Sequence, residues 1–338
     1  MKSRSMRLIQ GAAVASTLAA SVFAFVGGTA AVAGASGKKI SIGFVVGAEA
    51  DPFFQSMYVG AAAEAKALGV TLIWQGDPVD YSPSTQLPVI QQVLAEKPSA
   101  MVIAPTDTKA LQGVTNLSVK EGIPVINVDS GNANQSNITA WVTGYNNQGG
   151  VAAADALATA LHYTTACTAA KPCTVAVGVS SLTTSTDAAR VAGFNSEVKT
   201  KYPNFKLLNA VVSNSLPTKA QQGFATEITA DHLAGIFAVD GTDAEGASAA
   251  IAASGAAGKN IKVAGYDAYA SNEASLKTGA LAAIVSQQPT LEGKLAVQYA
   301  YDAAKHIKGI PHLKLLPNIL LTTANCAALC AKYVYVAS

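Results

Sequence analysis

Two stretches of sequence decide the fold of this chain: Gly-Ile-Pro-Val-Ile-Asn-Val-Asp at 122–129 and Asn-Ile-Lys-Val-Ala-Gly-Tyr-Asp at 260–267. Each is an apolar run that stops on a carboxylate. In a parallel sheet covered by helices, strands are nearly continuous hydrophobic runs, and ligands bind beyond their carboxyl ends. Two such sheets facing each other would direct Asp129 and Asp267 into one cleft. That pair of acceptors suits a ligand with many hydroxyls.

Strands and helices alternate along the rest of the chain. In the first half, Asp51 can cap a helix that begins at Pro52 and stops at Gly69. The predicted strands are 40–46, 70–74, 100–104, 125–129 and 141–144, then 174–179, 206–212, 236–239, 261–266 and 282–285. The predicted helices are 52–68, 86–96 and 108–121, then 146–161, 187–199, 218–230 and 243–253. Strands separated by helices indicate βαβ units, so we predict an α/β protein of two similar doubly wound lobes.

The N-terminus has the pattern of a secretory signal peptide. Lys2, Arg4 and Arg7 precede an uncharged stretch that runs from Leu8 to Gly37, and small residues fill cleavage-compatible sites such as 31–33 and 33–35. The alternative is an uncleaved membrane anchor, because this stretch is long enough to span a bilayer. Its Gly, Ser and Thr content favours removal of residues 1–35. No Cys follows that could carry a lipid, so we expect a periplasmic or secreted protein.

Composition narrows the possible partners. The 338 residues contain 23 Lys and Arg against 21 Asp and Glu, and half are hydrophobic. Three of the basic residues lie in the signal peptide, so the mature chain is close to neutral. Because no basic patch or stripe is present, we expect no binding to nucleic acid. The length exceeds one average domain, which agrees with two lobes.

The four cysteines fall into two local pairs. An even number behind a signal peptide predicts two disulfides, and local pairing is preferred among the three possible connectivities: Cys167 with Cys173, and Cys326 with Cys330. A zinc site would need closer Cys or His spacing, and the histidines form no cluster with these residues. A redox site would need Cys-x-x-Cys. We therefore expect no metal.

Several segments resemble the ribose-type periplasmic sugar-binding proteins. They occur in the family's order from about residue 40 to about 325, and this order is more specific than any single motif. The matching segments are Asp51-Pro52-Phe53-Phe54, Ala104-Pro105-Thr106-Asp107, Ile123-Pro124-Val125-Ile126, Arg190-Val191-Ala192-Gly193-Phe194, Ala264-Gly265-Tyr266-Asp267 and Gln287-Gln288-Pro289.

The resemblance implies the type I periplasmic binding protein fold, with two Rossmann-like lobes joined by three crossings. The N-terminal lobe would be 40–143 plus 288–318, and the C-terminal lobe 144–287 plus 319–338. The crossings would lie at 143–144, 287–288 and near Ile319. Such a protein captures a sugar or polyol and delivers it to the permease of an ABC importer. It acts as a monomer without cofactor, and lobe closure makes binding readable by the membrane partner.

Carried over residue by residue, the resemblance implies seven ligand-binding residues. Each has a structural alternative: core packing for the aromatic residues, helix capping or a turn for the aspartates, and a solvent-facing hinge amide for the glutamine. Phe54 is harder than Phe53 to bury on one helix face. The set is Asp51, Phe53, Phe54 and Asp129 on one lobe, with Asp240, Asp267 and Gln287 on the other.

The carboxylates can also be interpreted without the resemblance. An ionised Asp accepts through two oxygens and can hold neighbouring hydroxyls, and charge-assisted hydrogen bonds are about twice as strong as neutral ones. The position of Asp129 and Asp267 at strand ends favours a binding role. If both face an open cleft, removing either should weaken binding and change stability little.

Departures from the family pattern leave the ligand open. Ser130 and Ala188 stand where ribose-like members have arginines, Leu216 replaces an aromatic residue, and Asp240 replaces an Asn. The site has therefore lost two cations and gained a carboxylate. Ribose is not expected, and another polyol, a larger sugar or a ligand with an amine fits as well. Three further residues could fill the gaps: Asp187, Trp74 and Tyr145.

The sequence also bears on three other functional classes. A transcription regulator of this fold would carry a helix-turn-helix before residue 40, where the signal peptide stands. The chain lacks Gly-x-Ser-x-Gly, His-Glu-x-x-His, a P-loop and Gly-x-Gly-x-x-Gly after a strand, so we predict that it is not an enzyme. A ligand-sensing protein that presents a small molecule to a membrane receptor would use the same two-lobed clamp and stays an alternative, and a secreted enzyme on this fold is the weaker one.

Overall fold

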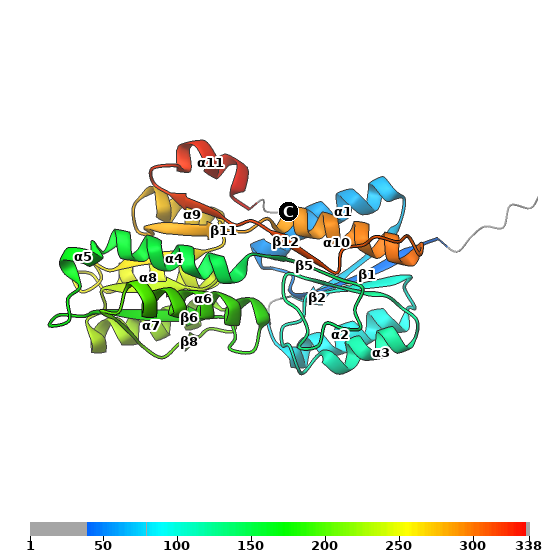
Figure 1. Cartoon of the computed structure of the whole chain (residues 1–338), viewed down its shortest axis with the longest axis horizontal. Helices are drawn as coiled ribbons and strands as arrows, with labels where there is room; N and C mark the ends of the chain where they lie inside the picture. The colour runs from blue at the N-terminus through cyan, green and yellow to red at the C-terminus, as the bar shows by residue number, and fades with distance from the viewer. Residues whose placement is uncertain (1–38, 79, 336–338) are drawn as a thin grey trace, which may run out of the picture. The chain divides into compact units, whose positions relative to one another are not determined.

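The computed structural model describes residues 39–78 and 80–335. The predicted signal peptide at 1–35 lies outside the described residues. The described chain forms two α/β lobes, each built on a mostly parallel sheet (Figure 1). The predicted fold class is confirmed.

The first lobe contains a sheet of six strands among the described residues, all of them parallel to their neighbours. Across the sheet, the order is β12 (Leu313–Leu316), β5 (Ala140–Gly144), β4 (Val125–Val128), β3 (Ala100–Ile103), β1 (Ser41–Ala48) and β2 (Thr71–Asp77). The five strands predicted for this lobe are all in the sheet, and β12 was not predicted.

The second lobe contains a sheet of seven strands among residues 39–78 and 80–335. Its order is β13 (Ile319–Thr322), β11 (Ala283–Ser286), β10 (Lys262–Tyr266), β9 (Gly235–Ala238), β6 (Cys173–Val179) and β7 (Phe205–Leu207), and β8 (Val211–Val212) pairs with β6. β13 runs antiparallel to β11, and every other pair is parallel.

Helices cover both faces of each sheet. In the first lobe, alternate β1 residues face opposite sides: Ile42 and Phe44 pack with α1 and α10, whereas Val45 packs with α2 and α3. The helices are α1 (Pro52–Leu68), α2 (Pro83–Ala95), α3 (Gln112–Lys120), α4 (Asn146–Ala160), α5 (Tyr163–Ala166), α6 (Ser185–Lys201), α7 (Pro217–Asp231), α8 (Gly241–Ala253), α9 (Ala270–Lys277), α10 (Pro289–Ala304) and α11 (Cys326–Tyr333).

Two glycines allow helix pairs to pack closely beside the interlobe cleft. A Cβ on Gly60 of α1 would lie 1.8 Å from the Thr290 carbonyl oxygen at the start of α10. In the second lobe, a Cβ on Gly193 of α6 would lie 2.0 Å from the Asn147 carbonyl oxygen of α4. No side chain fits at either distance. These contacts fix the positions of α1 and α6, whose N-terminal turns reach the cleft.

The chain passes between the two sheets at three places. The first passage follows β5, the second lies between β11 and α10, and the third lies between β12 and β13. They coincide with the three crossings that the resemblance implied. The exact lobe boundaries remain a proposal about which parts move together.

Some element boundaries differ from the prediction. Helix α2 begins three residues early, because Ser82 caps it and Pro83 occupies its first turn. The strand predicted at 206–212 is two short strands, β7 and β8, separated by an irregular link. The structure joins Cys167 to Cys173 and Cys326 to Cys330. Within the described residues, no helix is long and apolar enough to span a membrane.

Candidate functional site

A small, polar cavity lies between the lobes. Residues from both lobes line it, including all seven candidates from the sequence. Seven further residues were not among those candidates. The predicted set is Asp51, Phe53, Phe54, Asp129, Asp240, Asp267 and Gln287, and the additional set is Tyr81, Ser180, Thr186, Asp187, Arg190, Ser215 and Tyr269.

Asp129 and Asp267 occupy equivalent positions in the two lobes. Each follows its strand with a left-handed backbone, at φ 56° and 59°, and each donates its amide N–H to the neighbouring strand, to Val142 and Val285 respectively. Aspartate tolerates this conformation better than most residues. Neither is the N-cap of a described helix, so the capping alternative does not explain them.

The capping alternative does apply to Asp51 and Asp240. Asp51 caps α1 by accepting from the Phe53 N–H at 2.8 Å, and Asp240 caps α8 by accepting from the Asp243 N–H at 2.9 Å. Both carboxyls have further partners, because the Tyr269 hydroxyl donates to Asp51 and the Ser180 hydroxyl donates to Asp240. Each carboxyl therefore serves its helix and still lines the cavity.

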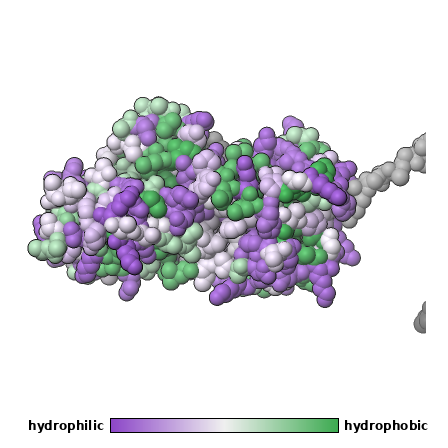
Figure 2. All heavy atoms as spheres, in the orientation of Figure 1, coloured by the Kyte–Doolittle hydropathy of each residue, from purple (hydrophilic) through white to green (hydrophobic). Residues whose placement is uncertain are grey.

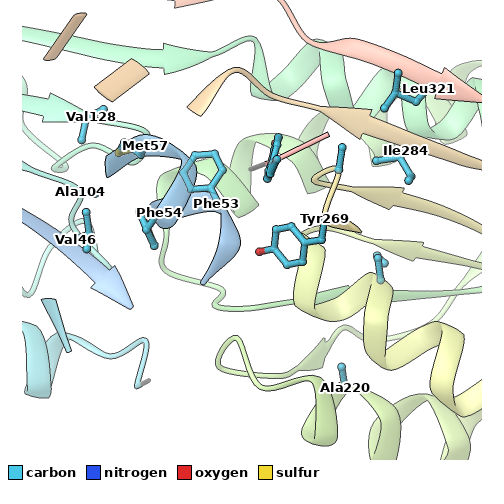
Figure 3. Packing of buried hydrophobic residues seen from close by; sticks show 14 of the residues in the cluster. Val46, Phe53, Phe54, Met57, Ala104, Val128, Ala220, Tyr269, Ile284 and Leu321 are labelled. Carbon is cyan, nitrogen blue, oxygen red and sulfur yellow. The ribbon is translucent and has the colours of Figure 1, made fainter. Parts of the chain in front are cut away.

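Phe53 and Phe54 line the cavity and also belong to the hydrophobic core. Their exposed fractions are 5% and 2%, so the expectation that Phe54 is the harder to bury is wrong. The reason is that Tyr81, from the segment before α2, stacks on the Phe54 ring. Figure 3 shows both rings on α1, with the Tyr269 hydroxyl of the other lobe directed toward them. Packing and ligand contact are thus compatible for both.

Asp267 is held by three donors at the base of the second lobe. The Gln287 amide donates to it at 2.7 Å, the Tyr335 hydroxyl at 2.8 Å and the Gly241 N–H at 3.2 Å. Tyr335 also accepts from the Gln287 N–H at 3.0 Å and packs its ring near Phe53. Gln287 is 2% exposed, which contradicts the alternative of a solvent-facing hinge amide. The C-terminal segment therefore supports the site from behind.

Arg190 is the single cation among the residues that line the cavity. Its Nε donates to Asn146 at 2.8 Å, its Nη1 donates to the Val239 carbonyl at 3.0 Å, and its guanidinium lies 4.1 Å from the Tyr266 ring centroid. The Asp187 carboxylate is 4.0 Å from Nη1 and accepts from the Ser181 N–H at 2.9 Å. Arg190 is therefore mostly engaged in holding the second lobe together.

Burial dominates the electrostatics of the carboxyls. It raises the pKa of Asp51 to about 7, against the hydrogen bonds from Tyr269 and Phe53, and the pKa of Asp129 to about 7, against the charge of Arg190. Burial, with the nearby Asp240 adding to it, raises the pKa of Asp187 to about 8. Burial also raises the pKa of Asp267. Each carboxyl therefore gains from a partner that stabilises its charge.

The two lobes contact each other around the cavity. The Thr184 hydroxyl donates to the Thr106 carbonyl at 2.8 Å, and the Gly131 N–H donates to the Ser185 hydroxyl at 2.8 Å. With the bond from Tyr269 to Asp51, these contacts join loops of different lobes. The structure is a closed arrangement in which the lining carboxyls are buried.

Two of the residues that depart from the family pattern lie outside the cavity lining. Ser130 is buried and donates to the Pro105 carbonyl at 2.7 Å, and Leu216 precedes α7, so neither lines the cavity. Of the three residues considered for the gaps, Asp187 lines the cavity. Trp74 packs on Phe44, and Tyr145 lies at the first crossing, both away from it.

Some lining residues were not predicted from sequence. Arg190 is one helical turn after Asp187, a spacing that could have placed both at the start of α6 on one face. Tyr81 and Tyr335 gave no signal, because only tertiary packing brings the segment before α2 and the C-terminal tail to the site.

Two Rossmann-like lobes that close over a polar cavity define a solute-binding protein of the two-lobed type. A periplasmic binding protein domain matches residues 42–308, and this chain belongs to that family. The predicted resemblance is confirmed.

Known relatives and solved structures agree with this assignment. The ribose import binding protein of Bacillus subtilis is 30% identical over 268 residues, which cover 78% of this chain and 82% of the relative. An ABC transporter solute-binding protein from Agrobacterium vitis, solved with α-D-tagatopyranose, is 29% identical with a TM-score of 0.81 and covers 88% of this chain and 100% of its own. A carbohydrate transporter solute-binding protein from Agrobacterium radiobacter, in complex with D-arabinose, is 28% identical with a TM-score of 0.82 and covers 89% of this chain and 100% of its own.

Proposed function

We propose that this chain is an exported solute-binding protein that captures a sugar or polyol between its lobes and delivers it to the permease of an ABC importer. The observation that carries the proposal is the interlobe cavity, whose lining includes aspartates from both lobes and two phenylalanine rings. Carboxylates accept from hydroxyls, and the ring faces offer an apolar surface to the CH groups of a sugar. The sugars bound by the two solved relatives support this chemistry.

The proposal assigns roles to individual residues. Asp129 and Asp267 hold hydroxyls from opposite lobes, Asp51 and Asp240 add acceptors, and Phe53 with Phe54 stack on the ligand. Gln287 orients Asp267 through its 2.7 Å hydrogen bond. No group in this set needs to perform catalysis, because the importer supplies the energy of transport.

Lobe closure is the signal that the permease reads. We propose that 40–143 plus 288–318 moves as one unit against 144–287 plus the tail, as a monomer, outside the cytoplasmic membrane after removal of residues 1–35. The contacts between Thr184 and Thr106 and between Ser185 and Gly131 form as the lobes close. Hinge motion of this kind is common in two-lobed binding proteins.

A thermal-shift screen of pentoses, hexoses, disaccharides and polyols tests the proposal. A ligand at about 100 times its dissociation constant stabilises the protein by about 2.7 kcal/mol. Any hit should also reduce the radius of gyration in X-ray scattering without changing secondary structure. If no member of the screen shifts the unfolding temperature, or if a hit causes no compaction, the proposed function is wrong.

A further inference from the structure

The cavity contains more negative groups than a neutral sugar needs. Five carboxyls line it against the single guanidinium of Arg190, a formal charge of −4 if all are ionised. One of these acids, Asp240, stands where the ribose-type pattern has an amide. The inference below rests on the proposed function and concerns the ligand's charge.

The five carboxyls differ in how well the protein itself satisfies them. Asp240 accepts from Ser180, Thr242 and its own helix, and Asp267 accepts from three donors. Asp51 accepts from Phe53 and Tyr269. Protein donors occupy these three groups, and they remain available to ligand hydroxyls only through their free lone pairs.

Asp129 and Asp187 have fewer protein donors. Asp187 accepts from the Ser181 N–H and lies 4.0 Å from Arg190, and Asp129 accepts from the N–H of Ser130. They come from opposite lobes and lie close enough for the charge of Asp129 to raise the pKa of Asp187. Tyr81, whose ring stacks on Phe54, lines the same cavity as both of them.

Acid exceeds base among the residues that line the cavity. Asp187 lies near Asp240 as well as Asp129, and the nearby guanidinium already donates through Nε and Nη1 to Asn146 and to the Val239 carbonyl. An ammonium group between Asp129 and Asp187 would stabilise the ionised form of both carboxyls, and it supplies three donors to oxygens that have few. A neutral hydroxyl would supply a donor without the compensating charge.

A metal ion fits less well than an organic cation. Among the described residues, one group of three potential ligands has atoms within 4.8 Å of one another, namely Glu273, Cys326 and Cys330, and both of these cysteines are in a disulfide. The cavity carboxyls therefore do not converge as metal ligands do. They line the cavity from both lobes, so separate carboxyls can meet separate polar groups of one ligand as the lobes close on it.

We propose that the ligand is a hydroxylated molecule with a protonated amine, such as an amino sugar or amino polyol, whose ammonium group binds between Asp129 and Asp187. Its hydroxyls then face Asp51, Asp240 and Asp267, and its CH groups face Phe53 and Phe54. This class differs from the neutral sugars that the solved relatives contain.

The test compares matched pairs of compounds by calorimetry at pH 7. The pairs are glucose and glucosamine, galactose and galactosamine, and D-glucitol and 1-amino-1-deoxy-D-glucitol. The N-acetylated amino sugars serve as uncharged controls. At least one amine should bind ten times or more tightly than its neutral partner and its N-acetylated form, as expected for charged hydrogen bonds.

Each other outcome overturns a defined part of the reasoning. If, in every pair that binds, the neutral compound has an affinity equal to or higher than that of the amine, this inference is wrong and the proposed function stands. If no member of either series binds and the wider sugar screen also fails, both are wrong. Stabilisation by Ca²⁺ that EDTA reverses, without any amine preference, would identify a metal site instead.

A variant locates the ammonium group. Asp187→Asn keeps the size and one acceptor oxygen but removes the charge, so affinity for the tightest amine should fall roughly tenfold or more, while a neutral partner changes by less than about threefold. Glu121→Gln removes one exposed carboxyl outside the cavity and should leave both affinities unchanged. An equal loss for amine and neutral compound in Asp187→Asn would show that Asp187 does not bind the charge.

Proton linkage gives a readout that packing changes would not move. Burial raises the pKa of Asp187 and Asp129, and an ammonium group would lower both again, so binding releases protons near pH 7. The titratable and charged groups around Asp187 are Asp240, Arg190, Asp129, Asp243 and Tyr81, and the Ser181 N–H donates to it. Calorimetry in phosphate and Tris buffers should therefore show proton release for the amine, reduced in Asp187→Asn. Uptake of protons, or none, contradicts the proposal.

Discussion

Removing Asp267 should cost this protein stability as well as affinity, whereas removing Asp129 should cost mainly affinity. The two residues have nearly the same left-handed backbone, at φ 59° and 56°, so replacement by Ala carries a similar backbone penalty at both. They differ in their partners. Asp267 accepts from Gln287, Tyr335 and the Gly241 N–H, and all three donors belong to its own lobe, the crossing or the tail, so they persist when the lobes open.

The magnitude follows from the donors left behind. An unsatisfied buried donor costs about 1–3 kcal/mol. Removing a buried acid whose pKa is raised recovers part of the cost of the three donors left behind. Asp267→Ala should therefore lower the free energy of unfolding by about 2–4 kcal/mol more than Asp129→Ala does. Both variants should bind ligand roughly tenfold to more than a hundredfold more weakly, because each loses a charged acceptor. The structure thus revises the expectation from sequence that neither change affects stability much.

Urea unfolding of the ligand-free variants, followed by fluorescence at pH 7, measures the difference. Asp267→Asn, which keeps one acceptor oxygen, should recover part of the lost stability and serves as the matched control. Equal stability in the two Ala variants would refute the reasoning, because it would mean that the three donors do not depend on Asp267. Unchanged ligand affinity in both variants would place the binding site elsewhere.

Three further predictions follow from the same structure. Burial raises the pKa of Asp187 from 3.8 to about 8, so the folded protein keeps a proton that the unfolded chain releases. Stability falls as pH rises wherever the folded state binds more protons than the unfolded chain. The unfolding temperature of the ligand-free protein should therefore drop between about pH 5 and 8, and Asp187→Asn should flatten this slope. An unfolding temperature that rises with pH would contradict the prediction. Tyr335→Phe keeps the ring but removes the donor to Asp267, so ligand affinity should fall roughly three- to tenfold with the fold intact. Calorimetry measures the affinity and circular dichroism the fold. A larger loss of affinity together with a changed spectrum would mean that Tyr335 is structural instead. Exported protein should start near Gly34 or Ser36 and contain no free thiol, which mass spectrometry after alkylation checks; an intact Met1 or alkylated cysteines would count against it.

Much of the architecture could be predicted from sequence because parallel strands buried on both faces leave a strong apolar signal. Runs such as 122–129 predicted both the strand and the carboxylate at its end. The boundaries were less certain where capping decides them: α2 begins at Pro83 because Ser82 accepts from the Ser84 N–H, a bond that hydrophobic periodicity does not indicate.

The face of the surface seen in Figure 2 mixes hydrophilic and hydrophobic residues over both lobes, in keeping with the nearly neutral composition. Composition alone therefore argued against a strongly basic surface that binds nucleic acid, but it could not indicate where a ligand binds. The seven candidates came from strand ends and from the family order of motifs. Their convergence on one cavity depends on how the two lobes close.

The sequence by itself determined the two α/β lobes and the aspartates at the strand ends, because these depend on periodicity and on neighbours along the chain. It favoured the two local disulfides, and the structure decided their connectivity. Only the tertiary structure decided which donors each carboxyl has and how many charges share the cavity. Tyr335 reaches Asp267 across 68 residues of sequence, and Tyr269 reaches Asp51 across 218. Contacts at such separations leave no local pattern. For this reason the excess of buried acid over Arg190, which governs the ligand's charge, became visible only after folding brought the lobes together.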